Sequence, residues 1–196
     1  MNNTLNKIAR IISQLSQPPL IIGLFITYLV FHYAPDTATG FLWLLIAGGL
    51  IGAVPTIFTF IAVKQGWIQD VLLSRREDRT GPMLIAAFGA IVTLITFYKM
   101  GVPADILVFL MALILVLTVI IFITLFWKIS VHAATITVVT ITINMLTGGE
   151  FWYLLLLIPI VAWSRVYRKK HSIAQVIAGV LTGGVIVYSI FELFGF

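Results

Sequence analysis

The chain has 196 residues and a formal net charge of +5, and 61% of its residues are hydrophobic while only 10% are charged. Soluble domains carry about 25% charged and about 45–50% apolar residues, and a soluble fold of this length has too little interior for such an apolar content. The sequence contains no cysteine, which excludes both a disulfide framework and a thiolate metal site.

The N-terminal segment, residues 1–17, is polar but has apolar residues at Ile8, Ile11, Ile12 and Leu15. This i, i+3, i+4, i+7 spacing predicts a short amphipathic helix that lies on the bilayer surface. A frayed polar tail is the alternative that the sequence leaves open.

Apolar segments fill most of the remaining chain, and a membrane-crossing helix needs about 20 mostly apolar residues. In chain order the segments are Pro19–Ala34, Gly40–Val63, Pro82–Phe97, Ile106–Trp127, Val131–Leu146, Phe151–Trp163 and Ile173–Phe194. The two short ones, Val131–Leu146 and Phe151–Trp163, form either two tilted crossings or one re-entrant hairpin, which gives seven or five full crossings. Counted as membrane-embedded segments, whether or not each crosses fully, these predict an all-α, polytopic membrane helical bundle with six or seven transmembrane segments, in which residues 1–196 form a single integral membrane domain.

The polar loops are distributed unevenly between the two sides of the membrane. The parity of the spans places the N-terminal tail and residues 64–81, 128–130 and 165–172 on one side. That side holds the basic residues Lys7, Arg10, Lys64, Arg75, Arg76, Arg79, Lys128, Arg165, Arg168, Lys169 and Lys170, whereas the other side holds only Lys99. The positive-inside rule predicts that the basic side faces the cytoplasm of a cell membrane.

The same basic residues stand beside apolar runs, so they suit a bilayer or an anionic lipid headgroup better than nucleic acid. We therefore expect no nucleic-acid partner. The sequence leaves the oligomeric state open, and a homo-oligomer is one of the states it allows.

Three polar clusters on the basic side could carry chemistry: residues 70–79, 128–133 and 164–175. They include His132, His171 and several arginines, which together suit phosphoryl transfer. Arginine forks pair with phosphate oxygens, a neutral histidine can attack phosphorus, and a second histidine can protonate the departing oxygen. His171 stands just before the last apolar segment, where a helix N-terminus attracts anions and helps to keep the imidazole neutral.

The first cluster also has a structural interpretation. Loop basic residues commonly serve as topology determinants. Arg76 and Arg79 would lie on one side of a helical stretch, and they could pair with Glu77, Asp78 or Asp70 rather than with a phosphate.

The third cluster has a structural interpretation as well, because Ser172 and Gln175 fit a capping box at a helix start. A metal site built from His132 and His171 lacks the tight ligand spacing of known metal motifs. We therefore expect neither a metal ion nor another cofactor.

The third cluster resembles the last signature of the type 2 phosphatidic acid phosphatase superfamily, S-R-x5-H, with Ser164-Arg165, five residues and then His171. The second cluster, Ile129-Ser130-Val131-His132, resembles the family's P-S-G-H signature with the serine and the histidine kept. The first cluster is similar to the family's basic first signature, with arginines in place of its usual lysine and R-P pair. The three clusters follow the family's order, and the resemblance makes residues 70–196 a phosphatase-like core.

The resemblance implies a role for each of these residues. His171 would be the nucleophile that forms a phosphohistidine, and His132 would protonate the leaving group and then activate water. Gln175 stands where the family usually has an aspartate, and a glutamine at this position resembles relatives of glucose-6-phosphatase and dolichyl diphosphate phosphatase. The carbonyl of Gln175 can accept the imidazole N–H and fix the tautomer. The residues that would hold the phosphate are Arg165, Arg76, Arg79, Lys128 and Ser130.

The function that the resemblance implies is a metal-independent membrane phosphatase that removes phosphate from a lipid phosphate or a polyprenyl diphosphate. The short chain offers no soluble domain for a water-soluble substrate, so the headgroup would reach the site from the bilayer plane. The alternatives are a lipid phosphotransferase and a non-catalytic membrane scaffold or transporter that retains the fold. A transporter commonly shows an internal repeat, and we find no convincing one.

Overall fold

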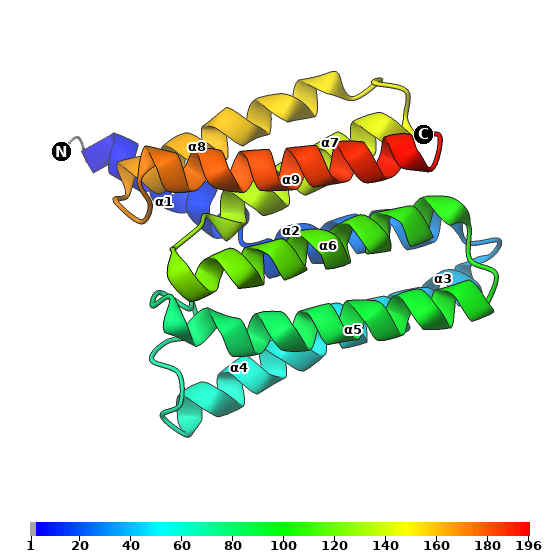
Figure 1. The fold of residues 1–196 in the computed structure, drawn as a ribbon, viewed down its shortest axis with the longest axis horizontal. Coiled ribbons are helices and arrows are strands. Elements are labelled where there is room, and N and C mark those ends of the chain that lie inside the picture. Colours follow the sequence, from blue (N-terminus) through cyan, green and yellow to red (C-terminus); the bar gives the residue numbers. More distant parts are fainter. Residues whose placement is uncertain (1–2) are drawn as a thin grey trace. The chain divides into compact units, whose positions relative to one another are not determined.

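The computed structural model describes residues 3–196, and all regular secondary structure in that range is helical (Figure 1). Residues 1–2 of the predicted amphipathic segment lie outside the described residues. The chain divides into two compact units. The first unit contains the chain up to Ile22 together with Lys128–Phe196, and the second unit contains Gly23–Trp127.

The first unit contains four helices and the start of a fifth. They are α1 (Asn3–Leu15), the first turn of α2 (Pro18–Tyr33), α7 (Val131–Leu146), α8 (Leu157–Tyr167), which follows the 3-10 helix η3 (Trp152–Leu156), and α9 (Ile173–Leu193). Helices α7 and α9 share the most extensive packing in the molecule, and α8 packs on both α7 and α1.

Two glycines of α9 allow its close approach to α7. A Cβ atom at Gly179 would lie 2.5 Å from the carbonyl oxygen of Ser130, and one at Gly183 would lie 2.8 Å from that of Ala134. Only glycine fits these two positions without displacing the backbone of α7. The small residues four apart form the G-x-x-x-G pattern by which helices in membranes pack closely.

The opposite face of α9 is exposed although it is apolar. Ile177, Leu181, Val185 and Tyr188 are each more than half exposed, whereas Val187 and Phe191 on the inner face are fully buried. Exposed large apolar side chains in a continuous row are unfavourable in water. The row therefore suits contact with lipid.

The second unit contains the rest of α2 and the helices of the central part of the chain. They are α3 (Thr37–Ala47), the π-helix η1 (Gly48–Ala53), α4 (Val54–Lys64), the 3-10 helix η2 (Glu77–Arg79), α5 (Thr80–Lys99) and α6 (Ala104–Phe126). The π-helical turns end at Ala53, two residues before Pro55, whose ring has no N–H to continue the α-helical pattern. A Cβ atom at Gly89 of α5 would overlap the carbonyl of Leu50, so α5 lies directly against these turns.

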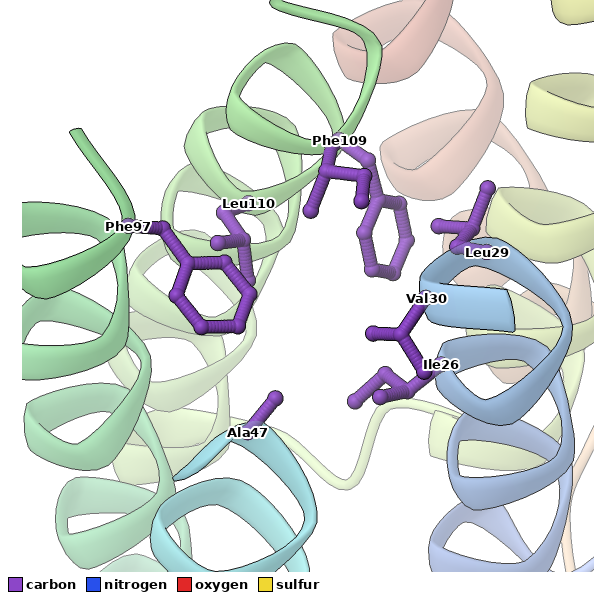
Figure 2. A pocket seen from close by; sticks show the side chains of 8 residues that line it. Ile26, Leu29, Val30, Ala47, Phe97, Phe109 and Leu110 are labelled. Atoms are coloured by element: carbon purple, nitrogen blue, oxygen red, sulfur yellow. The ribbon is translucent and has the colours of Figure 1, made fainter. Parts of the chain in front are cut away.

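The core of the second unit contains a narrow gap with a wholly apolar lining (Figure 2). Its walls include Val30 from α2, Ala47 from α3, Phe97 from α5 and Phe109 from α6. No polar group reaches this gap, so it is a packing feature and not a candidate for chemistry.

Four helical segments in the described part of the chain are long and apolar enough to cross a membrane. They are Thr37–Lys64, Glu77–Lys99, Ala104–Phe126 and Ile173–Leu193, and a fifth is added if the bent pair of α1 and α2 is counted as one span. Helix α7 and the segment Trp152–Tyr167 are apolar but shorter. The prediction of an all-α bundle is confirmed, and the finer count of six or seven spans is not. The 16 residues of α7 reach about 24 Å at about 1.5 Å per residue, which is short of a hydrocarbon core of about 30 Å.

Candidate active site

The end of α8 turns back on itself and brings His171 next to Arg165. Helix α8 ends at Tyr167, and Lys169 adopts a left-handed conformation with φ of 53°. The backbone N–H groups of Lys170 and His171 then donate to the carbonyl oxygen of Arg165, at 3.0 and 3.4 Å. The five residues between Arg165 and His171 thus contain the end of α8 and the tight turn that leads to α9.

His171 is held by the first turn of α9. Its Nδ1 lies 3.1 Å from Oε1 of Gln175, and its side chain is only 6% exposed. The capping box of Ser172 and Gln175 is present: Oε1 of Gln175 accepts the Ser172 backbone N–H at 3.2 Å, and the Ser172 hydroxyl accepts the Gln175 N–H at 3.3 Å.

The capping box fixes the tautomer of His171. Because the Ser172 N–H can only donate, the Gln175 amide must present its carbonyl oxygen, and not its NH2, on this side. A carbonyl oxygen only accepts, so Nδ1 of His171 carries the proton in this hydrogen bond. In the neutral ring the lone pair is therefore on Nε2.

The start of α7 lies against the start of α9. The backbone N–H of Ser130 donates to the carbonyl oxygen of Gln175 at 3.1 Å, and the Ser130 hydroxyl caps α7 by accepting the Ala133 N–H at 3.4 Å. Ser130 is fully buried. His132 is the second residue of α7, and Lys128 enters the same turn two residues before the cap, so both belong to the helix end that contacts Gln175.

Arg165 is buried and contacts the N-terminal helix. Its Nη1 donates a hydrogen bond to the hydroxyl of Ser13 in α1, and the two residues are only 7% and 3% exposed. The sequence reasoning missed this contact between residues 152 positions apart. No local sequence pattern signals this contact, and the structure shows it through the burial of Ala9 and Ser13, whose apolar neighbours on α1 are exposed.

The basic charge of the first unit is concentrated at this end. Residues 3–22 and 128–196 contain seven basic residues: Lys7, Arg10, Lys128, Arg165, Arg168, Lys169 and Lys170. The carboxylates of the same residues are Glu150, beyond the end of α7, and Glu192, near the end of α9. No carboxylate of this unit therefore neutralises the basic end, which favours binding of an anion.

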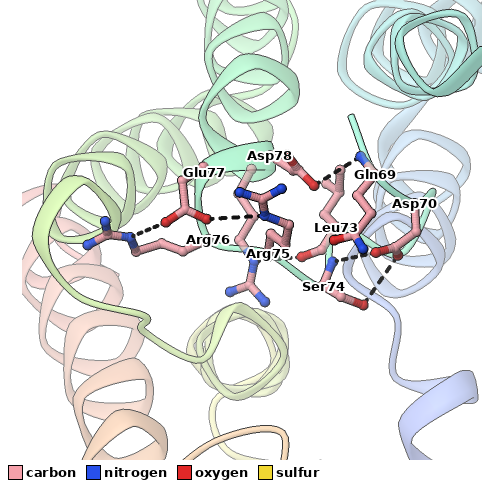
Figure 3. A network of polar contacts seen from close by, with 9 residues as sticks. Gln69, Asp70, Leu73, Ser74, Arg75, Arg76, Glu77 and Asp78 are labelled. Carbon is pink, nitrogen blue, oxygen red and sulfur yellow. Dashed lines mark hydrogen bonds and ion pairs between the residues drawn. The ribbon is translucent and has the colours of Figure 1, made fainter. Parts of the chain in front are cut away.

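The first predicted cluster lies in the second unit, where acidic groups accompany its arginines (Figure 3). Nε of Arg76 is 3.4 Å from Glu77 and Nε of Arg75 is 3.8 Å from the same carboxylate. Arg79 is buried, and its Nε donates to the carbonyl oxygen of Leu73 at 2.9 Å. These local contacts fit the structural interpretation of the cluster.

Two aspartates order the loop around these arginines. Asp70 accepts hydrogen bonds from the backbone N–H groups of Leu72 and Ser74, at 2.9 and 3.3 Å, and Asp78 accepts the N–H of Gln69 at 3.1 Å. The structure thus gathers His171, Gln175, Ser130 and Arg165 in the first unit. It gives Arg76 and Arg79 partners of their own in the second unit, and their role as phosphate ligands stays a prediction.

The residues from 3 to 196 contain no group of three or more histidine, aspartate or glutamate side chains that could hold a metal ion. Comparisons with protein-family models, with curated proteins and with solved structures gave no match.

Proposed function

We propose that this protein is a metal-independent membrane phosphatase that removes phosphate from a lipid phosphate or a polyprenyl diphosphate through a phosphohistidine. The observation that carries the proposal is the contact of His171 Nδ1 with Gln175 Oε1, at 3.1 Å. This contact orients the ring and leaves Nε2 as the nucleophilic nitrogen, as a histidine nucleophile requires. The basic end of the first unit, without a carboxylate, suits the negative charge of a phosphate.

The proposed reaction has two steps. In the first, the Nε2 lone pair of His171 forms a bond to phosphorus while the bond from phosphorus to the leaving oxygen breaks. That oxygen is the lipid oxygen of a monophosphate or the bridging oxygen of a diphosphate, and protonated His132 gives its proton to it. In the second, neutral His132 takes a proton from water, the resulting hydroxide attacks phosphorus, and the Nε2–phosphorus bond breaks. Inorganic phosphate leaves and both histidines return to their starting states.

The groups assigned to hold the phosphate are those at the basic end of the first unit. Arg165 and Lys128 supply positive charge, which offsets the charge that develops on the equatorial oxygens. The hydroxyl of Ser130 already accepts the Ala133 N–H, so its own proton is available for a phosphate oxygen.

The proposal includes a place in the cell. Six or seven transmembrane segments would cross a cell membrane. They would be formed by the helices that are long and apolar enough to cross a bilayer, together with the shorter α7 and α8. By the excess of basic residues, the end that carries His171 would face the cytoplasm. The substrate headgroup would enter from the plane of the bilayer.

One observation favours a rival function, a non-catalytic membrane scaffold that retains the arrangement. Arg165 is buried and donates to Ser13, so part of its guanidinium serves to hold α1 in place. A purely structural role for Arg165 would suit a scaffold, which binds no substrate. A lipid phosphotransferase is the third candidate, and it differs from the phosphatase only in the acceptor of the second step.

Phosphate release tests the proposal. The detergent-purified protein is incubated with EDTA and with polyprenyl diphosphate, phosphatidate or phosphatidylglycerophosphate, alongside the variants His171→Ala and His32→Ala. His32 is a suitable control because its ring stacks on Tyr28 in the second unit, with centroids 5.4 Å apart. We expect release that His171→Ala abolishes and His32→Ala keeps. No release by folded protein from any lipid would refute the phosphatase and leave the scaffold or the phosphotransferase.

A further inference from the structure

Helix α1 has three distinct faces. Ala9 and Ser13 are buried, and the apolar side chains of Ile8, Ile11 and Leu15 are between 42% and 62% exposed. The third face carries the polar side chains Asn3, Asn6, Lys7 and Arg10, which follow one another at i, i+3, i+4 and i+7. Because the apolar and polar faces flank the buried one, α1 suits the boundary between acyl chains and headgroups.

The polar face of α1 forms one wall of an open pocket. Its lining residues are Asn3, Asn6, Lys7, Arg10 and, from the turn after α8, Arg168. Three cations and two amides are donors that suit phosphate oxygens, and the guanidinium groups can each bind two oxygens at once. None of the described residues that line the pocket is acidic, so its charge favours an anion.

The pocket adjoins the candidate active site. Arg165 contacts Ser13, and the pocket residues Arg10 and Arg168 each lie three positions from this contact along their own segments. Along α1, three helical positions correspond to about 4.5 Å of axial rise. The pocket therefore lies beside the contact of Ser13 with Arg165.

We infer that this pocket binds a second phosphate group of the lipid substrate. This inference rests on the proposed phosphatase function and narrows its substrate to lipids that carry two phosphate groups, such as a prenyl diphosphate. The phosphate attacked by His171 lies toward Arg165, and the other phosphate lies among Lys7, Arg10 and Arg168. A lipid with one phosphate leaves the pocket unused and binds more weakly.

The first experiment measures binding without turnover. The full-length His171→Ala protein, in an uncharged detergent, is titrated by calorimetry with farnesyl diphosphate and with farnesyl phosphate. We expect a Kd about tenfold or more lower for the diphosphate, since one additional charge-assisted contact of about 1.4 kcal/mol corresponds to tenfold. The added substitutions Lys7→Gln and Arg10→Gln should abolish this difference.

The matched control is Lys170→Gln, which removes one exposed charge from the same turn but does not line the pocket. It should keep the preference for the diphosphate. A preference that survives in the Lys7→Gln/Arg10→Gln protein, or that Lys170→Gln abolishes equally, would overturn the inference. Loss of the preference when phosphatidylglycerol is added to the micelles would assign the pocket to bilayer lipids instead.

The second experiment separates this inference from the proposed function. The same charge variants with His171 intact are assayed for phosphate release from both farnesyl substrates. Release from both at equal KM, with no preference in binding, would refute the pocket and leave the phosphatase. A binding preference that the charge variants abolish, without release from any substrate, would refute the phosphatase and leave the pocket.

Discussion

The most informative structural perturbation is Gly179→Ala, because it addresses the contact that sets α7 against α9. The new Cβ atom would lie 2.5 Å from the carbonyl oxygen of Ser130, whereas ordinary contacts begin at 3.4 Å. The start of α7 must therefore move by nearly 1 Å. That movement stretches the hydrogen bond from the Ser130 N–H to the Gln175 carbonyl, which is 3.1 Å long in the native protein.

The magnitude follows from a matched substitution on the same helix. Overpacking by one methyl group typically costs about 1–3 kcal/mol. Gly184→Ala makes the same chemical change, but its Cβ would lie 3.5 Å from Ile141 and Thr137, which is an ordinary contact. It should be neutral or should stabilise the helix by about 0.5–1 kcal/mol. We expect a difference of about 2 kcal/mol between the two variants.

Thermal unfolding in detergent measures this difference. For a chain of this length, about 2 kcal/mol corresponds to a Tm difference of about 4–8 °C. If the proposed phosphatase activity is present, Gly179→Ala should lower it by about 100-fold, since a displacement of about 1 Å at a site can have that effect. Gly184→Ala should retain it. Equal Tm values for the two variants would refute the close packing of α7 on α9 at Gly179.

Three further predictions concern other contacts. Gln175→Ala should lower phosphate release by about 10–100-fold, the range for losing the hydrogen-bond partner that orients a functional histidine. Gln175→Glu keeps an acceptor oxygen and should retain phosphate release, and equal rates for the two variants would contradict this prediction. Arg79→Gln should expose residues 66–79 to proteolysis because it removes the hydrogen bond to the Leu73 carbonyl. Arg75→Gln should not, since the Arg75 side chain is 60% exposed and an exposed ion pair such as Arg75–Glu77 contributes little to stability. Hydrogen bonds from Thr39 lower the pKa of Asp36 at the start of α3, so its stabilising effect is present above the usual pKa of an aspartate and is lost as the pH falls through the lowered value. The Tm of the wild type should therefore fall more than that of Asp36→Asn between pH 6 and pH 3, and parallel curves would exclude a role for this carboxylate.

The helices could largely be predicted from the sequence because apolar runs bounded by prolines and polar residues define them locally. The predicted segment Val131–Leu146 coincides with α7, and the predicted start at Ile173 is the start of α9. The capping box of Ser172 and Gln175 was predicted for the same reason, since it depends on residues three apart. The π-helix before Pro55 was not predicted, because a proline within an apolar run indicates a distortion but not its form.

The contacts that assemble the candidate site could be predicted only in part. The approach of α7 to α9 depends on Gly179 and Gly183, whose spacing is visible in the sequence but does not identify the partner helix. The contact of Ser13 with Arg165 joins residues 152 positions apart, and no local pattern signals it. For Arg76, the sequence offered both a phosphate and Glu77 as partners, and the structure records the ion pair with Glu77.

The proposed function depends on Nε2 of His171 as the acceptor of the phosphoryl group. The most direct test traps the intermediate by rapid alkaline quenching of the protein with 32P-labelled lipid diphosphate, followed by mass spectrometry of the labelled peptide and separation of the two phosphohistidine isomers. We expect an acid-labile label on His171, at Nε2, because the Nδ1–H group donates a hydrogen bond to Gln175 Oε1. Phosphate release without label on His171, or a label at Nδ1, would contradict it.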